Sequence, residues 1–165
     1  MNIRAARKEN IEAIIDFVLP IRREVFPMLD HSHVPRDLHA FVHTYILPQR
    51  SAFLLAHDEK GTIVGCIGVV PYDGRFPDLS EAFELSNSAE IVKCYVDPMM
   101  RRNGVGKKLV QQAILFCKEQ QYTTAYLHTH LFLPGAVHFW DAHGFHLIKE
   151  EQDELETVHM AQIVL

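Results

Sequence analysis

Residues 89–110 read A-E-I-V-K-C-Y-V-D-P-M-M-R-R-N-G-V-G-K-K-L-V, and the fold prediction starts from this stretch. The apolar run 91–96 predicts a buried strand that ends at the following D-P pair. A short loop with Gly104 and Gly106 comes next, and the apolar periodicity of residues 105–119 predicts an amphipathic helix. Glycines at such a junction let the backbone approach a ligand closely, and the amides that begin a helix attract anions.

The charges of this loop favour a phosphate or pyrophosphate ligand. Residues 101–108 contain four basic side chains and no acid: Arg101, Arg102, Lys107 and Lys108. The pattern is neither a P-loop, which needs G-x-x-x-x-G-K-[ST], nor a dinucleotide fingerprint, whose third glycine would stand at Leu109. A tight turn before a helix, with no ligand, is the alternative interpretation.

Hydrophobic patterns predict a mixed α/β order for the rest of the chain. Strand patterns occupy 2–6, 52–57, 62–70, 91–96, 124–129, 145–150 and 157–164. Helical spacing occupies the segment from Ile11 to Pro20, the segment from Pro35 to Pro48, and residues 105–119 and 135–143. We expect residues 20–34 to be irregular and residues 71–89 to form a long exposed connection. No linker or repeat divides the chain, so residues 1–165 are predicted to be one domain with about seven strands and about four helices.

Composition restricts the classes of partner. Lys and Arg number 16 against 21 Asp and Glu, a formal charge of −5, which disfavours binding to nucleic acid. No apolar run approaches the ~20 residues of a membrane span, and no secretory signal is visible, so no membrane contact is expected. Three cysteines are too few for a disulfide framework. A reducing, cytoplasmic location is therefore the expectation.

Three segments resemble the GNAT superfamily of acyl-CoA-dependent N-acyltransferases. R-R-N-G-V-G at 101–106 is similar to the family's R/Q-x-x-G-x-G/A loop, and E-I-V-K-C-Y-V-D-P at 90–98 is similar to its central strand. A-V-H-F-W-D-A-H-G-F at 136–145 resembles the A-x-x-F-Y-x-x-x-G-F segment. The resemblance implies a mixed sheet that splays between the central strand and the next, and an N-acetyltransferase that uses acetyl-CoA.

The resemblance also implies which residues bind the cofactor. The pyrophosphate would lie on the loop, and the pantetheine arm would pair with the central strand. Trp140 would pack against the cofactor. The implied set is Cys94, Tyr95, Val96, Arg101, Arg102, Asn103, Gly104, Val105, Gly106, Lys107 and Trp140.

Glu90, which opens the central strand, occupies the position of the family's general base. Amine acylation needs a neutral amine, so some group must accept a proton, directly or through water. A glutamate whose pKa is near 4.3 is a weak base, and a surface carboxylate with no role is the alternative. The family's acidic tyrosine is replaced by Trp140, whose indole has no useful acidity, and its frequent asparagine by Leu133.

His128 and His130 are the candidate substitutes, because residues two apart share one face of a strand. Either histidine could relay a proton or contact the substrate, and we take His130 as the candidate; an ordinary strand-face role is the alternative. A metal site is not expected, since each histidine pair lacks further ligands at the usual spacing.

The acceptor is expected to be a primary amine of a small molecule or peptide. By the resemblance it enters near residues 20–34 and 71–89. Residues 73–90 have a net charge of −4, which suits a cationic amine, whereas Arg22, Arg23, His31 and His33 suit an acceptor with a carboxylate. A non-catalytic acyl-CoA-binding or protein-interaction module is the alternative function. Homodimers are common in such folds, and the sequence specifies none.

Overall fold

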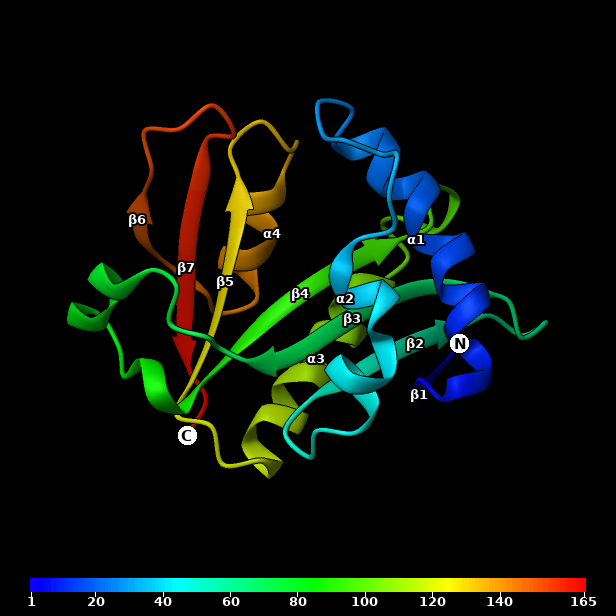
Figure 1. Cartoon of the computed structure of the whole chain (residues 1–165), viewed down its shortest axis with the longest axis horizontal. Helices are drawn as coiled ribbons and strands as arrows, with labels where there is room; N and C mark the ends of the chain where they lie inside the picture. Colours follow the sequence, from blue (N-terminus) through cyan, green and yellow to red (C-terminus); the bar gives the residue numbers. More distant parts are fainter. The chain divides into compact units, whose positions relative to one another are not determined.

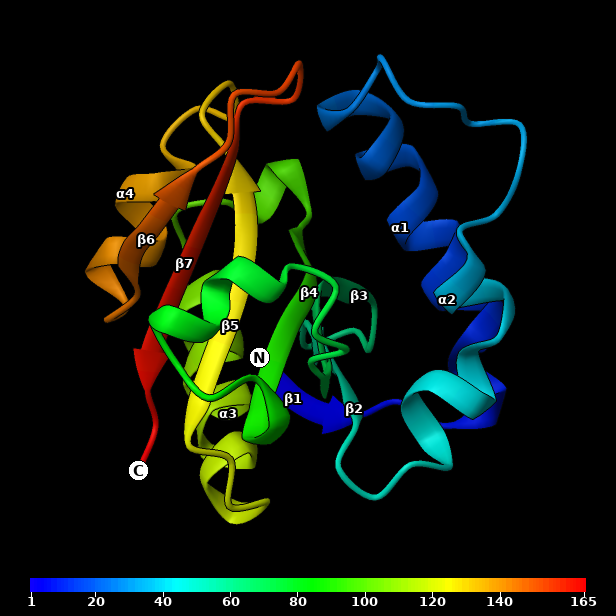
Figure 2. The ribbon, with the colours of Figure 1, turned by 60° about the vertical axis from the view of Figure 1, so that its left-hand side comes forward.

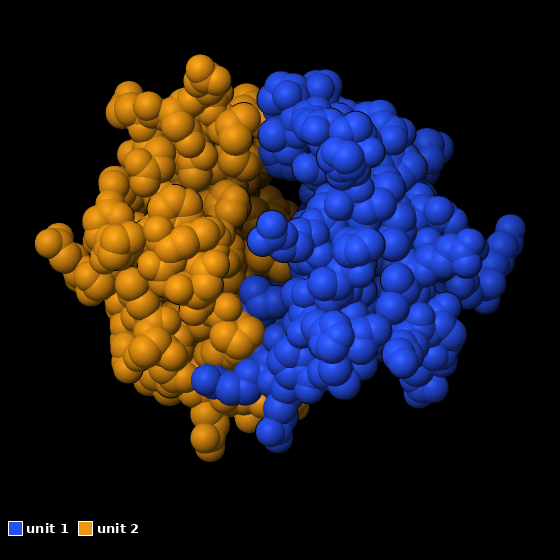
Figure 3. Space-filling view, in the orientation of Figure 1, with its two compact units in different colours: residues 1–70, 93–113 blue, residues 71–92, 114–165 orange.

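The computed structural model describes all residues from 1 to 165 and contains two compact units (Figure 3). Unit 1 comprises residues 1–70 and 93–113, and unit 2 comprises residues 71–92 and 114–165. The boundary falls before the last residue of β3 (Ile63–Pro71), inside β4 (Ser88–Val96) and inside one helix, α3 (Val105–Glu119). None of the helices is both long and apolar enough to cross a membrane.

Seven strands form one mixed sheet in the order β1-β2-β3-β4-β5-β7-β6, which confirms the predicted α/β fold class. Helices interrupt the strands along the chain (Figure 1). The strands other than β4 are β1 (Asn2–Ala5), β2 (Ala52–His57), β3 (Ile63–Pro71), β5 (Thr124–His130), β6 (His146–Glu150) and β7 (Thr157–Ile163).

In unit 1, β1, β2 and β3 pair antiparallel. The turn between β2 and β3 is held by Asp58, whose carboxylate accepts the N–H groups of Lys60 and Thr62, and Gly61 takes a φ of +81° there. Rings of Phe41, Tyr45 and Phe53 meet at centroid distances of 4.9 to 5.0 Å in the core of this unit. Short 3₁₀ turns, η1 (Lys8–Asn10) and η5 (Pro98–Met100), lie before α1 and after β4.

The helices before β2 differ from the prediction. Helix α1 (Ile11–Val25) continues through Pro20. Burial of Ile14, Val18 and Ile21 stabilises the helix by more than the loss of the one backbone hydrogen bond that proline cannot donate. The predicted second helix is instead a single turn, α2 (Arg36–His39), followed by the π-helical turn η2 (Val42–Ile46).

In unit 2, β5 pairs antiparallel with β7 along its whole length, and β7 pairs with β6. The parallel ladder between β4 and β5 is only three residue pairs long, from Ser88–Thr124 to Glu90–Tyr126, as expected for strands that splay. Helix α4 (Ala136–Ala142) lies on one face of these strands (Figure 2). Trp140 on this helix packs against Phe145, with ring centroids 5.3 Å apart.

The segment after β3 has many exposed residues, as predicted, but it also packs part of its length onto β5. It forms two 3₁₀ turns, η3 (Pro77–Glu81) and η4 (Leu85–Asn87), that lie across β5 (Figure 2). Leu79 is 2% exposed and joins Tyr72 and Tyr126 in an apolar cluster. Apolar side chains hidden among the acids, which the charge pattern obscured, explain the difference.

Candidate functional site

The glycine loop of unit 1 has the backbone shape that the sequence predicted. Gly104 has a φ of +79°, and a Cβ placed on it would meet no atom within 4 Å, so its surface is open. Arg102 also lies in the left-handed region, with a φ of +64°. The Asn103 side-chain amide donates to the carbonyls of Met100 and Arg101 and so shapes the loop. Helix α3 begins directly after Gly104, with its first amides unpaired within the helix.

The loop's four basic side chains, Arg101, Arg102, Lys107 and Lys108, are exposed. Arg101 comes within 4.0 Å of Glu24, and both side chains are exposed, so this pair contributes little. Open backbone, positive charge and a helix start together fit a pyrophosphate group.

Lys93 interrupts β4 in a way that the sequence did not predict. Its φ of +51° departs from strand geometry, and its ammonium lies 3.2 Å from the Asp37 carboxylate. Asp37 in turn accepts a 2.6 Å hydrogen bond from the Tyr45 hydroxyl. The only sign of this interruption in the sequence is that a lysine stands within an apolar run. The predicted cofactor strand, Cys94–Val96, follows directly and is half-buried.

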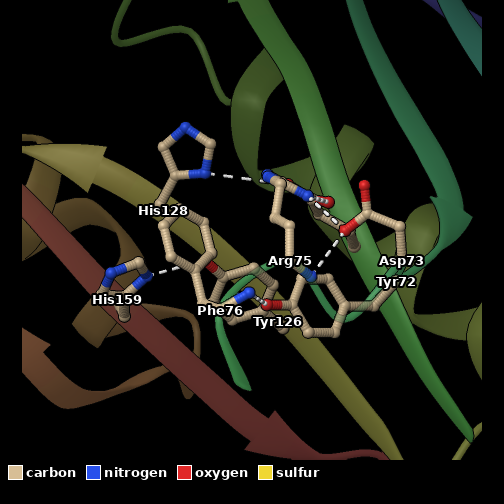
Figure 4. A network of polar contacts seen from close by, with 8 residues as sticks. Tyr72, Asp73, Arg75, Phe76, Tyr126, His128 and His159 are labelled. Carbon is tan, nitrogen blue, oxygen red and sulfur yellow. Dashed lines mark hydrogen bonds and ion pairs between the residues drawn. The ribbon is translucent and has the colours of Figure 1, made fainter. Parts of the chain in front are cut away.

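Glu90 lies in unit 2 and forms a bidentate ion pair with Arg75 (Figure 4). The two N···O distances are 2.7 and 2.6 Å, and the Glu90 side chain is 5% exposed. Asp73 binds the same guanidinium at 2.9 Å. The guanidinium also lies over the Tyr72 and Phe76 rings, 5.7 and 5.1 Å from their centroids.

This pairing governs the acidity of Glu90. Burial raises the pKa of its carboxyl, but the hydrogen bonds and charges of Arg75 and His128 outweigh burial and leave the pKa below its ordinary value. Glu90 is therefore a carboxylate at neutral pH and a weak direct base.

Comparison with known proteins identifies the family. The family model described as "Acetyltransferase (GNAT) family" matches residues 15–145. The chain belongs to the GNAT acetyltransferase family.

Curated relatives of this GNAT chain include N-acetyltransferase 8 of Homo sapiens, 28% identical over 109 residues, which are 66% of this chain and 44% of that protein. An uncharacterized N-acetyltransferase of Schizosaccharomyces pombe is 30% identical over 59% of this chain and 53% of that protein. The chain thus spans about half the length of the curated relatives that it matches.

Solved structures match over the whole chain. A GNAT-family acetyltransferase from Staphylococcus aureus Mu50 is 26% identical with a TM-score of 0.78, over 99% of each chain. A ribosomal-protein-alanine N-acetyltransferase from Brucella melitensis has the same TM-score and coverage at 16% identity, which shows the fold alone.

The predicted histidines of this GNAT protein lie near Glu90 in different ways. His128, 35% exposed, has Nδ1 3.7 Å from Glu90 Oε2. His130 is buried, and its Nδ1 donates to the Leu155 carbonyl at 2.9 Å. Burial lowers the pKa of His130, despite that bond. The structure brings His128, rather than His130, to the carboxylate.

A second network of hydrogen-bonded side chains in unit 2 was not predicted from the sequence. The hydroxyl of Tyr126 is 2.7 Å from His159 Nδ1 (Figure 4). His159 Nε2 is 3.0 Å from Glu151. Tyr126 and His159 are both fully buried, so this network stabilises the core and does not face a ligand. Because Tyr126 and His159 are 33 residues apart, no local sequence pattern predicts their contact.

Trp140, predicted beside the cofactor, is 7% exposed and packs against Phe139 and Phe145 in unit 2. Cys66 and Cys117 are buried free cysteines. No group of three or more His, Cys, Asp or Glu side chains is placed to hold a metal ion.

Proposed function

We propose that this GNAT protein transfers an acetyl group from acetyl-CoA to the primary amine of a small molecule or peptide. The observation that carries the proposal is the open, positively charged loop around Gly104 at the start of α3. The curated relatives, which are named N-acetyltransferases, support it. Three free cysteines support a cytoplasmic location.

The cofactor set proposed for this reaction has two parts. Backbone amides and basic side chains of residues 101–107 would hold the pyrophosphate, and main-chain groups of residues 94–96 would pair with the pantetheine arm. Trp140 would act through the packing of α4. Bound acetyl-CoA supplies the thioester that activates the acetyl group.

Glu90 would accept the amine proton through a relay, because Arg75 holds its pKa low. A water molecule or the exposed His128, 3.7 Å away, would carry the proton. A histidine is suited to this step, since its ordinary pKa lies near neutrality. His130 remains the second proposed relay. The neutral amine then attacks the acetyl carbon, and the CoA thiolate leaves.

Release of free thiol from acetyl-CoA, measured against a panel of primary amines, tests the proposal. We expect Glu90→Gln to lower kcat by about 100-fold, the usual loss on removing a general base. Asp73→Asn is the matched control, because Asp73 binds the same guanidinium but is largely exposed, and its kcat should stay near that of the wild type.

Acetyl-CoA binding without turnover of any amine would reject the enzyme and favour the non-catalytic acyl-CoA-binding module. Turnover that Glu90→Gln leaves intact would retain the activity and reject Glu90 as the base.

A further inference from the structure

Lys93 has a backbone conformation that its residue type disfavours. Its φ of +51° lies in the left-handed region, inside strand β4. Where a strand contains one left-handed residue, as in one class of β-bulge, that residue is usually glycine, because a Cβ disfavours a positive φ. The conformation of Lys93 is therefore held by the contacts of its side chain and of its main chain.

A half-buried ion pair in unit 1 holds the side chain of Lys93. The ammonium lies 3.2 Å from the Asp37 carboxylate, and the two side chains are 17% and 27% exposed. Asp37 also accepts a 2.6 Å hydrogen bond from the hydroxyl of the buried Tyr45. Partly buried charges are screened less by solvent and salt than surface charges are. Asp37, fixed by the aromatic core of unit 1, thus anchors the ammonium.

The main chain of Lys93 is held from β3. The thiol of Cys66, which is fully buried, donates to the Lys93 carbonyl at 3.3 Å. Burial raises the pKa of this thiol, so the sulfur keeps its proton and remains a donor. After the interruption, the Asp97 N–H donates to the Val64 carbonyl at 2.9 Å. Strand β3 therefore contacts the main chain on both sides of the donor strand, Cys94–Val96.

The conformation of Lys93 sets the directions of the peptide groups that follow it. A left-handed residue bends a strand and redirects the groups after it. Residues 94–96 come directly after Lys93, and their main-chain groups are proposed to pair with the pantetheine arm. The ladder between β4 and β5 ends at Glu90 and does not use those groups. An ordinary strand φ at residue 93 would turn them in other directions.

We propose that Lys93 and Asp37 are positioning residues of the acyl-CoA site: their ion pair holds the left-handed backbone of residue 93 and so presents residues 94–96 to the pantetheine arm. Neither side chain has to contact the donor. This inference rests on the proposed function and explains the shape of the donor strand. A protein without the ion pair populates that shape less, and its affinity for the donor falls by the same fraction.

Two variants at position 93 separate the backbone shape from the ion pair. Lys93→Met and Lys93→Gly both leave Asp37 without its partner, but only methionine keeps the Cβ that disfavours a positive φ. In calorimetry with acetyl-CoA, Kd should rise about 10-fold for Lys93→Met. For Lys93→Gly it should stay within about threefold of the wild type, because glycine takes a positive φ readily.

Asp37→Asn tests the same ion pair without a change at position 93. It should raise Kd for acetyl-CoA about 10-fold, and adding Lys93→Gly should restore Kd to within about threefold of the wild type. Lys8→Met, which removes an exposed lysine of unit 1, is the control for loss of one positive charge and should leave Kd unchanged.

An NMR measurement without donor separates failure of this inference from failure of the proposed function. A positive φ brings the amide and α protons of one residue close together, so the NOE between them is strong. At residue 93 this NOE should be strong in the wild type and weaker in Lys93→Met and Asp37→Asn.

A strong NOE in both of these variants, or equal Kd values for Lys93→Met and Lys93→Gly, would overturn the positioning role while the acetyltransferase activity stands. A wild-type protein that binds no acetyl-CoA would reject the proposed function, and with it the donor that the ion pair is proposed to serve.

Discussion

Arg22, in the segment 20–34, and Arg75, in the segment 71–89, have opposite surroundings. Arg75 makes two hydrogen bonds to a buried carboxylate and a third to Asp73. Arg22 makes one hydrogen bond, to a neutral imidazole. The Arg75 guanidinium is committed to the fold, whereas that of Arg22 forms no ion pair. The pairing of a charge, rather than its presence in the sequence, decides how much it contributes to the fold.

Removing Arg75 should produce the largest loss of stability. Arg75→Met leaves Glu90 buried without a partner and should cost about 3 kcal/mol of the free energy of unfolding. Arg22→Met is the control and should cost under about 1 kcal/mol, since only one bond to a neutral group is lost. Urea denaturation at pH 7 measures both.

Equal losses for the two variants would show that the contrast between the arginines is wrong. The double variant Arg75→Met/Glu90→Gln sharpens the result. It removes both charges, so it should be more stable than Arg75→Met alone.

The cost of Arg75→Met should depend on pH. The pKa of Glu90 is lowered in the fold from an ordinary value of 4.5, so its stabilisation is complete above about pH 4.5 and is lost as the pH falls through the folded value. The unfolded chain cancels in the stability difference between wild type and Arg75→Met, and loss of Arg75 raises the pKa of the buried Glu90 in the variant, so the difference should shrink as the pH falls from that raised pKa to the lowered pKa of the wild type, by at most about 1.4 kcal/mol per pH unit for one proton.

Urea denaturation from pH 7 to pH 3 measures this difference, and taking the difference cancels the buried histidines, whose titration both proteins share. The corresponding difference for Arg22→Met should lack the decline below pH 4.5. A flat profile for Arg75→Met would show that Glu90 is not the group that Arg75 stabilises.

The smallest expected effect concerns the cationic loop of unit 1, where the pyrophosphate of the donor is proposed to bind. Gly104→Ala should cost about 1 kcal/mol of stability, because a Cβ disfavours its φ of +79°. Gly61→Ala is a matched control, since Gly61 has a φ of +81° and equally open surroundings. Both should lose similar stability.

Calorimetry with acetyl-CoA then distinguishes the two glycines. Only Gly104→Ala should weaken binding, because only that backbone is proposed to face the pyrophosphate. Unchanged binding in Gly104→Ala would place the cofactor elsewhere.

Local patterns predicted the regular elements well. The helix 105–119 and the strand 52–57 have the predicted bounds, because their apolar periodicity also matches the face that is buried. Pro20 was misread as a helix end, since the buried face of α1 outweighs one missing backbone bond. Residues 71–89 were predicted to be an exposed connection, and many of them are exposed, but their acids masked the buried Tyr72 and Leu79.

The sequence by itself determined the family, the order of strands and helices, and the glycine loop, because these depend on residues that are near one another in the chain. Only the tertiary structure decided which charges are neutralised. Arg75 and Glu90 are 15 residues apart, Asp78 and Lys149 are 71 apart, and no local pattern predicts such partners. Folding brings these groups within a few ångströms. Burial of Glu90 makes its pair with Arg75 strong, the Asp78–Lys149 pair stays exposed, and the side-chain hydrogen bond of Arg22 goes to His31.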